Sequence, residues 1–241
     1  MAPMAKKEIK IKKGKKETGS QEALTKKAYK GIRRKLFFNE ISPGQKIYYC
    51  DLAEEMHRSP TPVIQALKWL EFQGLVRHEN NRGFFLEPVS LDEIKEIYRL
   101  RRTIEVDLLR QSIERLTDAD LKKLEKVLDS YEETHRSNYH KRQFIAAREF
   151  HLTLASFAHA PITFTTLHRL FDLIYLKYQV DTLFPRASDQ SIKSHREIFN
   201  RLKARDCEGA CSALTVDIEN VGRRVVDNMQ KNLEEKEHFQ I

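Results

Sequence analysis

The sequence has few cysteines and lacks any long apolar run. Three cysteines occur in 241 residues, at positions 50, 207 and 211, too few and too dispersed for a disulfide framework. No apolar stretch approaches the roughly 20 residues that a helix needs to cross a bilayer, and the N-terminus has no apolar signal core. We therefore expect a cytoplasmic protein with no membrane partner.

Cys207 and Cys211 are four residues apart, which places them one turn apart on a helix. This spacing is compatible with a redox pair or with metal ligands. A thiol needs a basic neighbour to become a reactive thiolate, and the sequence by itself identifies no such partner. The simpler interpretation is two small residues on one helix.

Positive charge is concentrated near the N-terminus. The chain has 43 lysines and arginines against 35 aspartates and glutamates, a formal net charge of +8. Residues 1–90 hold 18 basic and 10 acidic side chains, so the rest of the chain is neutral overall. A basic segment joined to a neutral one indicates a module that binds a polyanion and a second module with another task.

Residues 1–20 are rich in lysine and have neither an aromatic residue nor a sustained apolar face. This composition predicts a disordered arm. Such an arm can follow a phosphate backbone and add affinity that depends on salt and not on base sequence. The alternative is a solvated leader with no role in binding.

The segment 21–88 has the pattern of a winged helix-turn-helix DNA-binding domain. Apolar residues recur at three- and four-residue steps at its start, which predicts a first helix. Asp51 is expected to cap a second helix and Thr61 to cap a third. Two short strands, near residues 75–77 and 84–86, would form the wing, and the third helix would enter a DNA major groove.

Beyond Ser90 the sequence shows almost no strand signal. Ser90 and Thr117 are expected as helix caps, and Pro161 and Pro185 as breaks. Segment 91–236 is therefore predicted to form an all-α bundle that can enclose a pocket, which makes the whole chain mainly α. The helical stretches are expected at residues 91–115, 118–137, 139–158, 161–183, 189–204 and 206–236.

Several blocks resemble the GntR family of transcription regulators, in the FadR-type branch with a helical FCD effector-binding domain. Their order, over about residues 22–230, is that of the family. The resemblance implies a homodimer that binds a palindromic double-stranded DNA operator and responds to a small organic acid. The matching blocks are ISPGQKI, DLAEEMHRSPTPVIQALKWLEFQGLV, NRGFFLEPVS, IYRLRRTIE, AREFHLTLASFAHAP and SHREIFNRLKARDCEGA.

The recognition helix departs from the family pattern. Members usually read Ser-Arg-Thr-Pro-Val-Arg-Glu-Ala-Leu, and this chain has Pro60 and Ile64 in place of the two arginines. Arginine can hold a guanine through two hydrogen bonds, whereas proline and isoleucine cannot. We therefore expect a different operator or binding through other groups, with Gln65 pairing an adenine edge. The candidate DNA-binding residues are Arg58, Ser59, Thr61, Gln65, Lys68, Arg77, His78, Arg82 and Gly83.

The resemblance also implies a divalent metal site. Many FCD domains bind a metal through an Asp-x-x-x-His motif and two later histidines. In this chain the first position is Ala147, and the other three are His151, His195 and Asp217. Two imidazoles and one carboxylate form an open ligand set for Zn²⁺, Ni²⁺, Mn²⁺ or Fe²⁺.

Two features leave the metal site open to another interpretation. The carboxylate that the family has at position 147 is missing, which weakens a site, and buried histidines are often hydrogen-bonded core residues. Glu149 and Asp181 are candidates for a fourth ligand.

Arg101 and its neighbour Arg102 match the arginine that faces the effector pocket in similar proteins, where it would hold a ligand carboxylate. Alternatively, Glu105, one turn further along the helix, neutralises Arg101 through an ion pair.

The combined expectation is a ligand-responsive transcription regulator and not an enzyme. An architectural DNA-binding dimer without an effector is one alternative. A metal-dependent hydrolase is another, since the two histidines and Asp217 would activate a water molecule. No second acid–base group and no nucleophile motif accompany them in the sequence.

Overall fold

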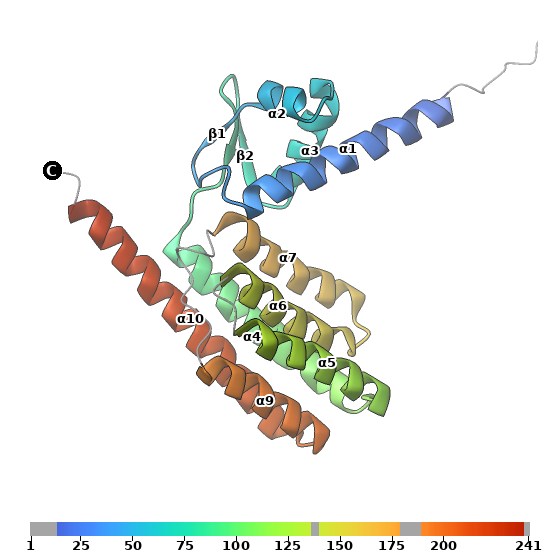
Figure 1. Ribbon diagram of the computed structural model, residues 1–241, viewed down its shortest axis with the longest axis vertical. Coiled ribbons are helices and arrows are strands. Elements are labelled where there is room, and N and C mark those ends of the chain that lie inside the picture. Colours follow the sequence, from blue (N-terminus) through green and yellow to red (C-terminus); the bar gives the residue numbers. More distant parts are fainter. Residues whose placement is uncertain (1–13, 136–139, 179–188, 239–241) are drawn as a thin grey trace, which may run out of the picture. The chain divides into compact units, whose positions relative to one another are not determined.

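The computed structural model describes residues 14–135, 140–178 and 189–238 (Figure 1). The chain divides into two compact units, Met1–Glu87 and Pro88–Ile241. The protein is mainly α-helical with one small sheet, which confirms the predicted fold class. Among the described residues, no helix has the length and apolar character needed to span a membrane.

The first unit is a winged helix-turn-helix. Ile32 and Leu36 on its first helix are buried with Val63, Leu67 and Leu70 on its third, and these two helices pack against each other. The three strands form an antiparallel sheet with the last strand in the centre. The elements are α1 (Gly14–Phe37), β1 (Lys46–Ile47), α2 (Tyr49–Glu55), α3 (Pro60–Phe72), β2 (Val76–Glu79) and β3 (Gly83–Leu86).

Two helices of this unit begin earlier than predicted. Helix α2 begins at Tyr49, so Asp51 lies inside its first turn and does not cap it. Helix α3 begins at Pro60, so Thr61 is not its cap either. The fixed φ of a proline suits the first helical position, which explains why α3 starts at the first proline of the turn.

The segment predicted as a disordered arm overlaps the first helix. Helix α1 begins at Gly14, so residues 14–20 are helical and not disordered, while residues 1–13 lie outside the described part of the chain. No proline interrupts the segment up to Phe37. Adding residues to an existing helix is easier than starting one. The part of α1 that packs against α3 can therefore be continued toward the N-terminus, to Gly14.

The second unit is an all-α bundle in which α10 packs along α4 and α9 (Figure 1). The predicted caps are confirmed, since Ser90 Oγ accepts from Glu93 N at 3.3 Å and Thr117 Oγ1 from Asp120 N at 3.2 Å. The elements are α4 (Leu91–Ile113), α5 (Asp118–His135), α6 (His140–Ser156), α7 (Pro161–Lys177), α9 (Asp189–Lys203) and α10 (Cys207–His238).

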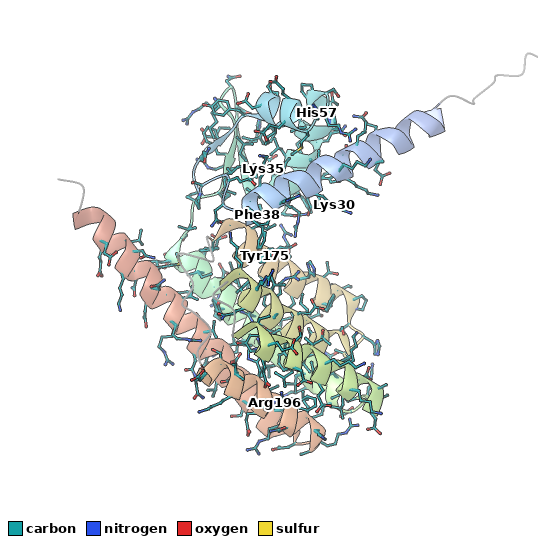
Figure 2. All side chains as sticks on the ribbon, in the orientation of Figure 1. Lys30, Lys35, Phe38, His57, Tyr175 and Arg196 are labelled. Carbon is teal, nitrogen blue, oxygen red and sulfur yellow. The ribbon has the colours of Figure 1, made fainter. Side chains whose placement is uncertain are left out.

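Ion pairs join helices α5 and α9. Arg196, labelled in Figure 2, donates from Nε to Glu132 Oε1 at 2.9 Å and from a terminal nitrogen to Asp129 Oδ1 at 3.0 Å. Both acceptors belong to α5. Since His195 directly precedes Arg196, these bonds help to set the rotation of α9 that directs His195 into the bundle.

Candidate functional site

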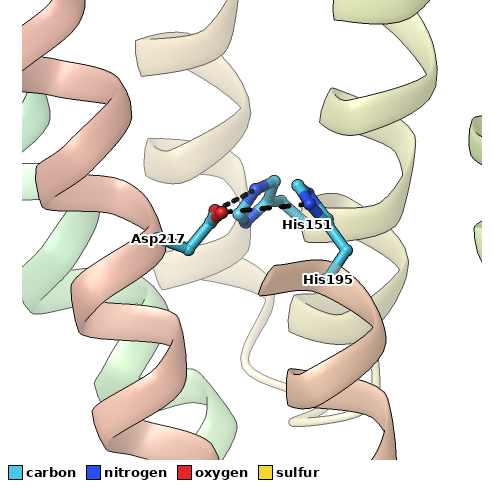
Figure 3. A group of neighbouring side chains, drawn as sticks. All are labelled: His151, His195 and Asp217. Atoms are coloured by element: carbon cyan, nitrogen blue, oxygen red, sulfur yellow. Dashed lines mark ion pairs between the residues drawn. The ribbon is translucent and has the colours of Figure 1, made fainter. Parts of the chain in front are cut away.

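Three helices bring His151, His195 and Asp217 together inside the second unit (Figure 3). They come from α6, α9 and α10, and all three side chains are buried. One ligand atom from each residue can be chosen so that all three atoms lie within 4.8 Å of one another. His151 Nε2 is 3.6 Å from Asp217 Oδ2, and His195 Nδ1 is 3.9 Å from Asp217 Oδ1. The residues singled out in the sequence thus form one cluster.

A backbone contact sets the proton position on His195. Its Nδ1 lies 2.7 Å from the carbonyl oxygen of Ser191, one helical turn earlier. A carbonyl only accepts hydrogen bonds, so Nδ1 carries the proton. Burial lowers the pKa of His195, although Asp217 partly opposes this effect, and the ring therefore tends to be neutral. Its lone pair is then on Nε2, a buried atom with no hydrogen-bond partner among the described residues.

Glu105 orients the second histidine. Its Oε2 lies 2.6 Å from His151 Nδ1. Burial by itself would raise the pKa of the Glu105 carboxyl, but Arg101 and His151 together hold this pKa below its ordinary value. The ionised carboxylate accepts a hydrogen bond from Nδ1–H, and Nε2 of His151 is directed toward Asp217, 3.6 Å from its Oδ2. This carboxylate–histidine pair is the arrangement that orients metal-binding histidines in proteins.

Arg101 is held inside the bundle by the same carboxylate. Its Nε donates to Glu105 Oε1 at 2.9 Å, and the two side chains are only 4% and 3% exposed, which confirms the predicted ion pair. The guanidinium also lies over the rings of Phe171, at 4.2 Å, and Tyr98, at 5.1 Å. Arg102 has a different position, since it is partly exposed and pairs with Glu219 at 2.5 Å.

Glu149 does not serve as a fourth ligand of the cluster. Glu149 is exposed and lines a groove with residues of α5, so its expected role as a ligand of the buried set is wrong. Asp181 lies outside the described residues. Ala147 packs against the core one turn before His151.

A cavity of about 260 Å³ adjoins Asp217 between α9 and α10. Arg224 is part of its wall and donates to Ser191 Oγ at 3.0 Å. Asp217 and Arg224 are seven residues apart, which is two helical turns on one face, and this spacing could have identified Arg224 from the sequence. The residues lining the cavity are Gln190, Ser191, Ser194, Asp217, Asn220, Val221, Arg223 and Arg224.

Tyr98 adds a polar atom that sequence reasoning missed. Its hydroxyl is buried, with no hydrogen-bond partner among the described residues. Burial raises the pKa of Tyr98 to about 12, so the hydroxyl keeps its proton near neutral pH and can donate it. No feature of the sequence distinguishes this tyrosine from an ordinary core tyrosine.

The first unit presents the predicted DNA-binding residues of α3 on one exposed face. Thr61, Gln65 and Lys68 are exposed and follow steps of four and three residues, opposite the buried face of α3. Arg58 and Ser59, in the preceding turn, are exposed as well.

Gln65 is already engaged by α1. The hydroxyl oxygen of Thr25 lies 2.8 Å from its side-chain amide. A contact with an adenine edge uses both polar atoms of the amide, so the contact expected from Gln65 would share its Oε1 with the Thr25 hydroxyl.

The wing carries its own negative charge. Arg77 and Arg82 both form ion pairs with Glu79, and both guanidiniums lie over the ring of Phe85, at 4.9 and 5.4 Å. The exposed ring of His78 lies 4.7 Å from that of Phe84, and Gly83 has φ +98°, a conformation that favours glycine at the end of the turn. The predicted wing residues are therefore close together, but Glu79 partly neutralises their charge.

Comparison with known proteins matches both units. Residues 24–86 match the family model described as bacterial regulatory proteins, gntR family, and residues 96–220 match the FCD domain. The HTH-type transcriptional regulator YdhC of Bacillus subtilis is 25% identical over 183 residues, which cover 76% of this chain and 82% of that protein. The HTH-type transcriptional regulator McbR of Escherichia coli is 24% identical over 189 residues, which cover 78% of this chain and 86% of that protein.

Solved structures show the same fold. The structure of McbR/YncC from E. coli matches 87% of this chain and 98% of its own, with a TM-score of 0.73 and 22% identity. The structure of a putative GntR transcriptional regulator from Rhodococcus sp. RHA1 aligns with 85% of this chain and with 98% of its own chain. The TM-score is 0.72 and the sequence identity 20%.

Proposed function

Because this chain belongs to the GntR family of transcription regulators with an FCD domain, we propose that it binds a palindromic DNA operator as a homodimer and that a small carboxylate alters this binding. The observation that carries the effector part is the buried cluster of His151, His195 and Asp217, in which Nε2 of His195 has no hydrogen-bond partner among the described residues. The family match carries the DNA-binding part. Members of this family are regulators, and the chain is one of them.

A divalent metal fits the buried cluster. Nε2 of both histidines and a carboxylate oxygen of Asp217 would hold Zn²⁺, Ni²⁺, Mn²⁺ or Fe²⁺, with Glu105 fixing the ring of His151. When bound, such a metal would provide a Lewis-acidic site for an oxygen of the effector. Three protein ligands leave coordination positions open, since Ala147 supplies none.

The cavity beside Asp217 supports a carboxylate as the effector. Arg223 and Arg224 place positive charge in its wall, and Ser191 and Asn220 add hydrogen-bonding groups. Arg101 is less suited to bind a ligand directly, because Glu105 already holds it. Arg224 would instead bind a carboxylate that enters between α9 and α10.

This assignment predicts the effect of Arg224→Gln. Loss of a charge-assisted hydrogen bond should weaken binding of small acids by roughly tenfold or more. Titration calorimetry with the acid that most stabilises the wild-type protein measures the change. Arg99→Gln is the matched control, because Arg99 is an exposed arginine paired only loosely with Glu96, at 3.6 Å. Equal affinities for the wild-type protein and Arg224→Gln would contradict the role of Arg224.

One experiment separates a ligand-responsive regulator from an architectural DNA binder. Metal content is determined on the protein as isolated, and small acids are then screened for thermal stabilisation with and without a chelator. We expect bound metal, stabilisation by at least one acid that the chelator removes, and altered binding of a palindromic duplex in its presence. A metal-free protein that no acid stabilises would support the architectural role. Absence of any preference for specific over random DNA would contradict operator recognition.

The wing provides a further prediction. Glu79→Ala should release Arg77 and Arg82 for contacts with DNA phosphates. Because exposed ion pairs are worth about 0–1 kcal/mol, we expect DNA affinity at low salt to rise by up to about fivefold. Fluorescence anisotropy across a salt series measures this, and the slope against salt concentration should steepen. Glu133→Ala is the control, since it makes the same change in net charge at an exposed position on α5. Weaker DNA binding by Glu79→Ala would show that Glu79 instead positions the arginines for contact.

A further inference from the structure

Two cysteines lie together on α10, away from the histidine cluster. Cys207 is the first residue of α10 and is half-buried, and Cys211 follows one turn later and is buried. The two thiols are close enough for Cys211 to raise the pKa of Cys207. Arg110 of α4 contacts the Cys211 sulfur and forms an ion pair with Glu208 at 3.1 Å. The basic neighbour that the sequence did not identify therefore comes from another helix.

A cavity gives access to this pair. It has a volume of about 610 Å³, and Cys207 forms part of its wall. Arg110, Glu114 and Arg205 supply polar groups, and the apolar part is formed by Ile113 and Leu116. A small molecule in this space would contact Cys207, and Cys211 follows one turn later on α10.

Helix geometry decides which chemistry the two thiols can perform. Cβ atoms four residues apart on a helix are about 5–6 Å apart. A disulfide needs about 3.5–4.5 Å between Cβ atoms, so direct oxidation would distort α10. An atom that bonds to both sulfurs and sits between them bridges the longer distance without moving the backbone. Burial and the neighbouring Cys211 also raise the pKa of Cys207, which reduces its thiolate content and its reactivity with peroxides.

We propose that Cys207 and Cys211 form a binding site for a trivalent arsenical that carries one organic substituent. Such a compound, R–As(OH)₂, condenses with the two thiols to form two As–S bonds and releases two water molecules, without oxidation or reduction. Two sulfurs complete the three bonds of this arsenic, the third being to its substituent. Inorganic arsenite, which forms up to three As–S bonds, is less well matched, since the remaining cysteine, Cys50, belongs to the first unit. The substituent would occupy the cavity beside Ile113 and Leu116.

Phenylarsine oxide tests the site on the full-length protein. After addition of one equivalent, the protein is denatured and its free thiols are counted, and the intact mass is measured. We expect one arsenical per chain and loss of two of the three thiols. Excess dithiol should reverse the adduct, and an equal concentration of monothiol groups should not. Treatment with hydrogen peroxide should give no disulfide between Cys207 and Cys211.

Three variants make the outcome decisive. Cys50→Ser should bind like the wild-type protein, because Cys50 is exposed on the first unit. Cys207→Ser and Cys211→Ser should each fail to form the adduct that an excess of monothiol cannot reverse. Circular dichroism shows whether both variants are folded. If Cys211→Ser unfolds, Cys207→Ser still tests the site, because Cys207 is less buried. An adduct that survives in Cys207→Ser, an adduct that disappears in Cys50→Ser, or no loss of thiols at one equivalent would overturn the proposal.

Discussion

Replacing Glu105 with alanine is expected to destabilise the helical unit by about 3–5 kcal/mol, the usual cost of removing one partner from a buried ion pair. Arg101 would keep its charge inside the bundle, against the rings of Tyr98 and Phe171, with no carboxylate beside it. His151 would also lose the acceptor of its Nδ1 proton. Both losses fall on buried groups, so water cannot replace the missing bonds without opening the bundle.

Urea denaturation in the presence of a chelator measures this free energy of unfolding without a contribution from bound metal. Glu219→Ala is the matched control, because Glu219 pairs with the partly exposed Arg102 and should cost no more than about 1 kcal/mol. The double variant Arg101→Met/Glu105→Leu should recover much of the lost stability, since it removes both charges and keeps the volume. Equal destabilisation by Glu105→Ala and Glu219→Ala would show that the buried pair contributes little.

Replacing His195 with alanine is expected to abolish tight binding of divalent metals. Loss of a residue that supports a metal ligand without binding the metal typically costs about 10–100-fold in metal affinity. His195 would itself be one of the three ligands found among the described residues, so the loss should be larger. The remaining His151 and Asp217 cannot close a metal site by themselves. The stabilisation that added Zn²⁺ or Ni²⁺ gives the wild-type protein should disappear.

Equilibrium dialysis against a competing chelator gives the affinities, and thermal shifts with and without metal provide a second readout. His168→Ala is the control, because His168 lies on α7 in contact with Arg148, outside the cluster. Glu105→Gln should have an intermediate effect, since it keeps an acceptor for His151 Nδ1 but removes the charge. If His195→Ala had the same metal affinity as the wild-type protein, any metal would bind elsewhere, and the two histidines would be core residues.

Periodicity and capping chemistry predicted most of the secondary structure. Helices α4, α5 and α7 begin where Ser90 and Thr117 can cap and where Pro161 can start a helix, because these signals act within a few residues. Local reasoning failed at Asp51 and Thr61, where more than one residue of a short turn could begin the helix. In both cases the helix begins before the residue that was expected to cap it.

The sequence by itself determined the order of the elements, the two units and the residue types that meet at the buried cluster. These follow from apolar spacing and from motifs that resemble those of the family, even though single positions such as Pro60, Ile64 and Ala147 depart from it. Only the tertiary structure decided that Glu105 orients His151, that Thr25 of α1 contacts Gln65, and that Arg110 of α4 lies beside Cys211. Such pairings depend on the rotation of each helix and on partners from other elements. A hydrophobic pattern indicates which face of a helix is buried. It does not indicate which side chain of a neighbouring element packs against that face.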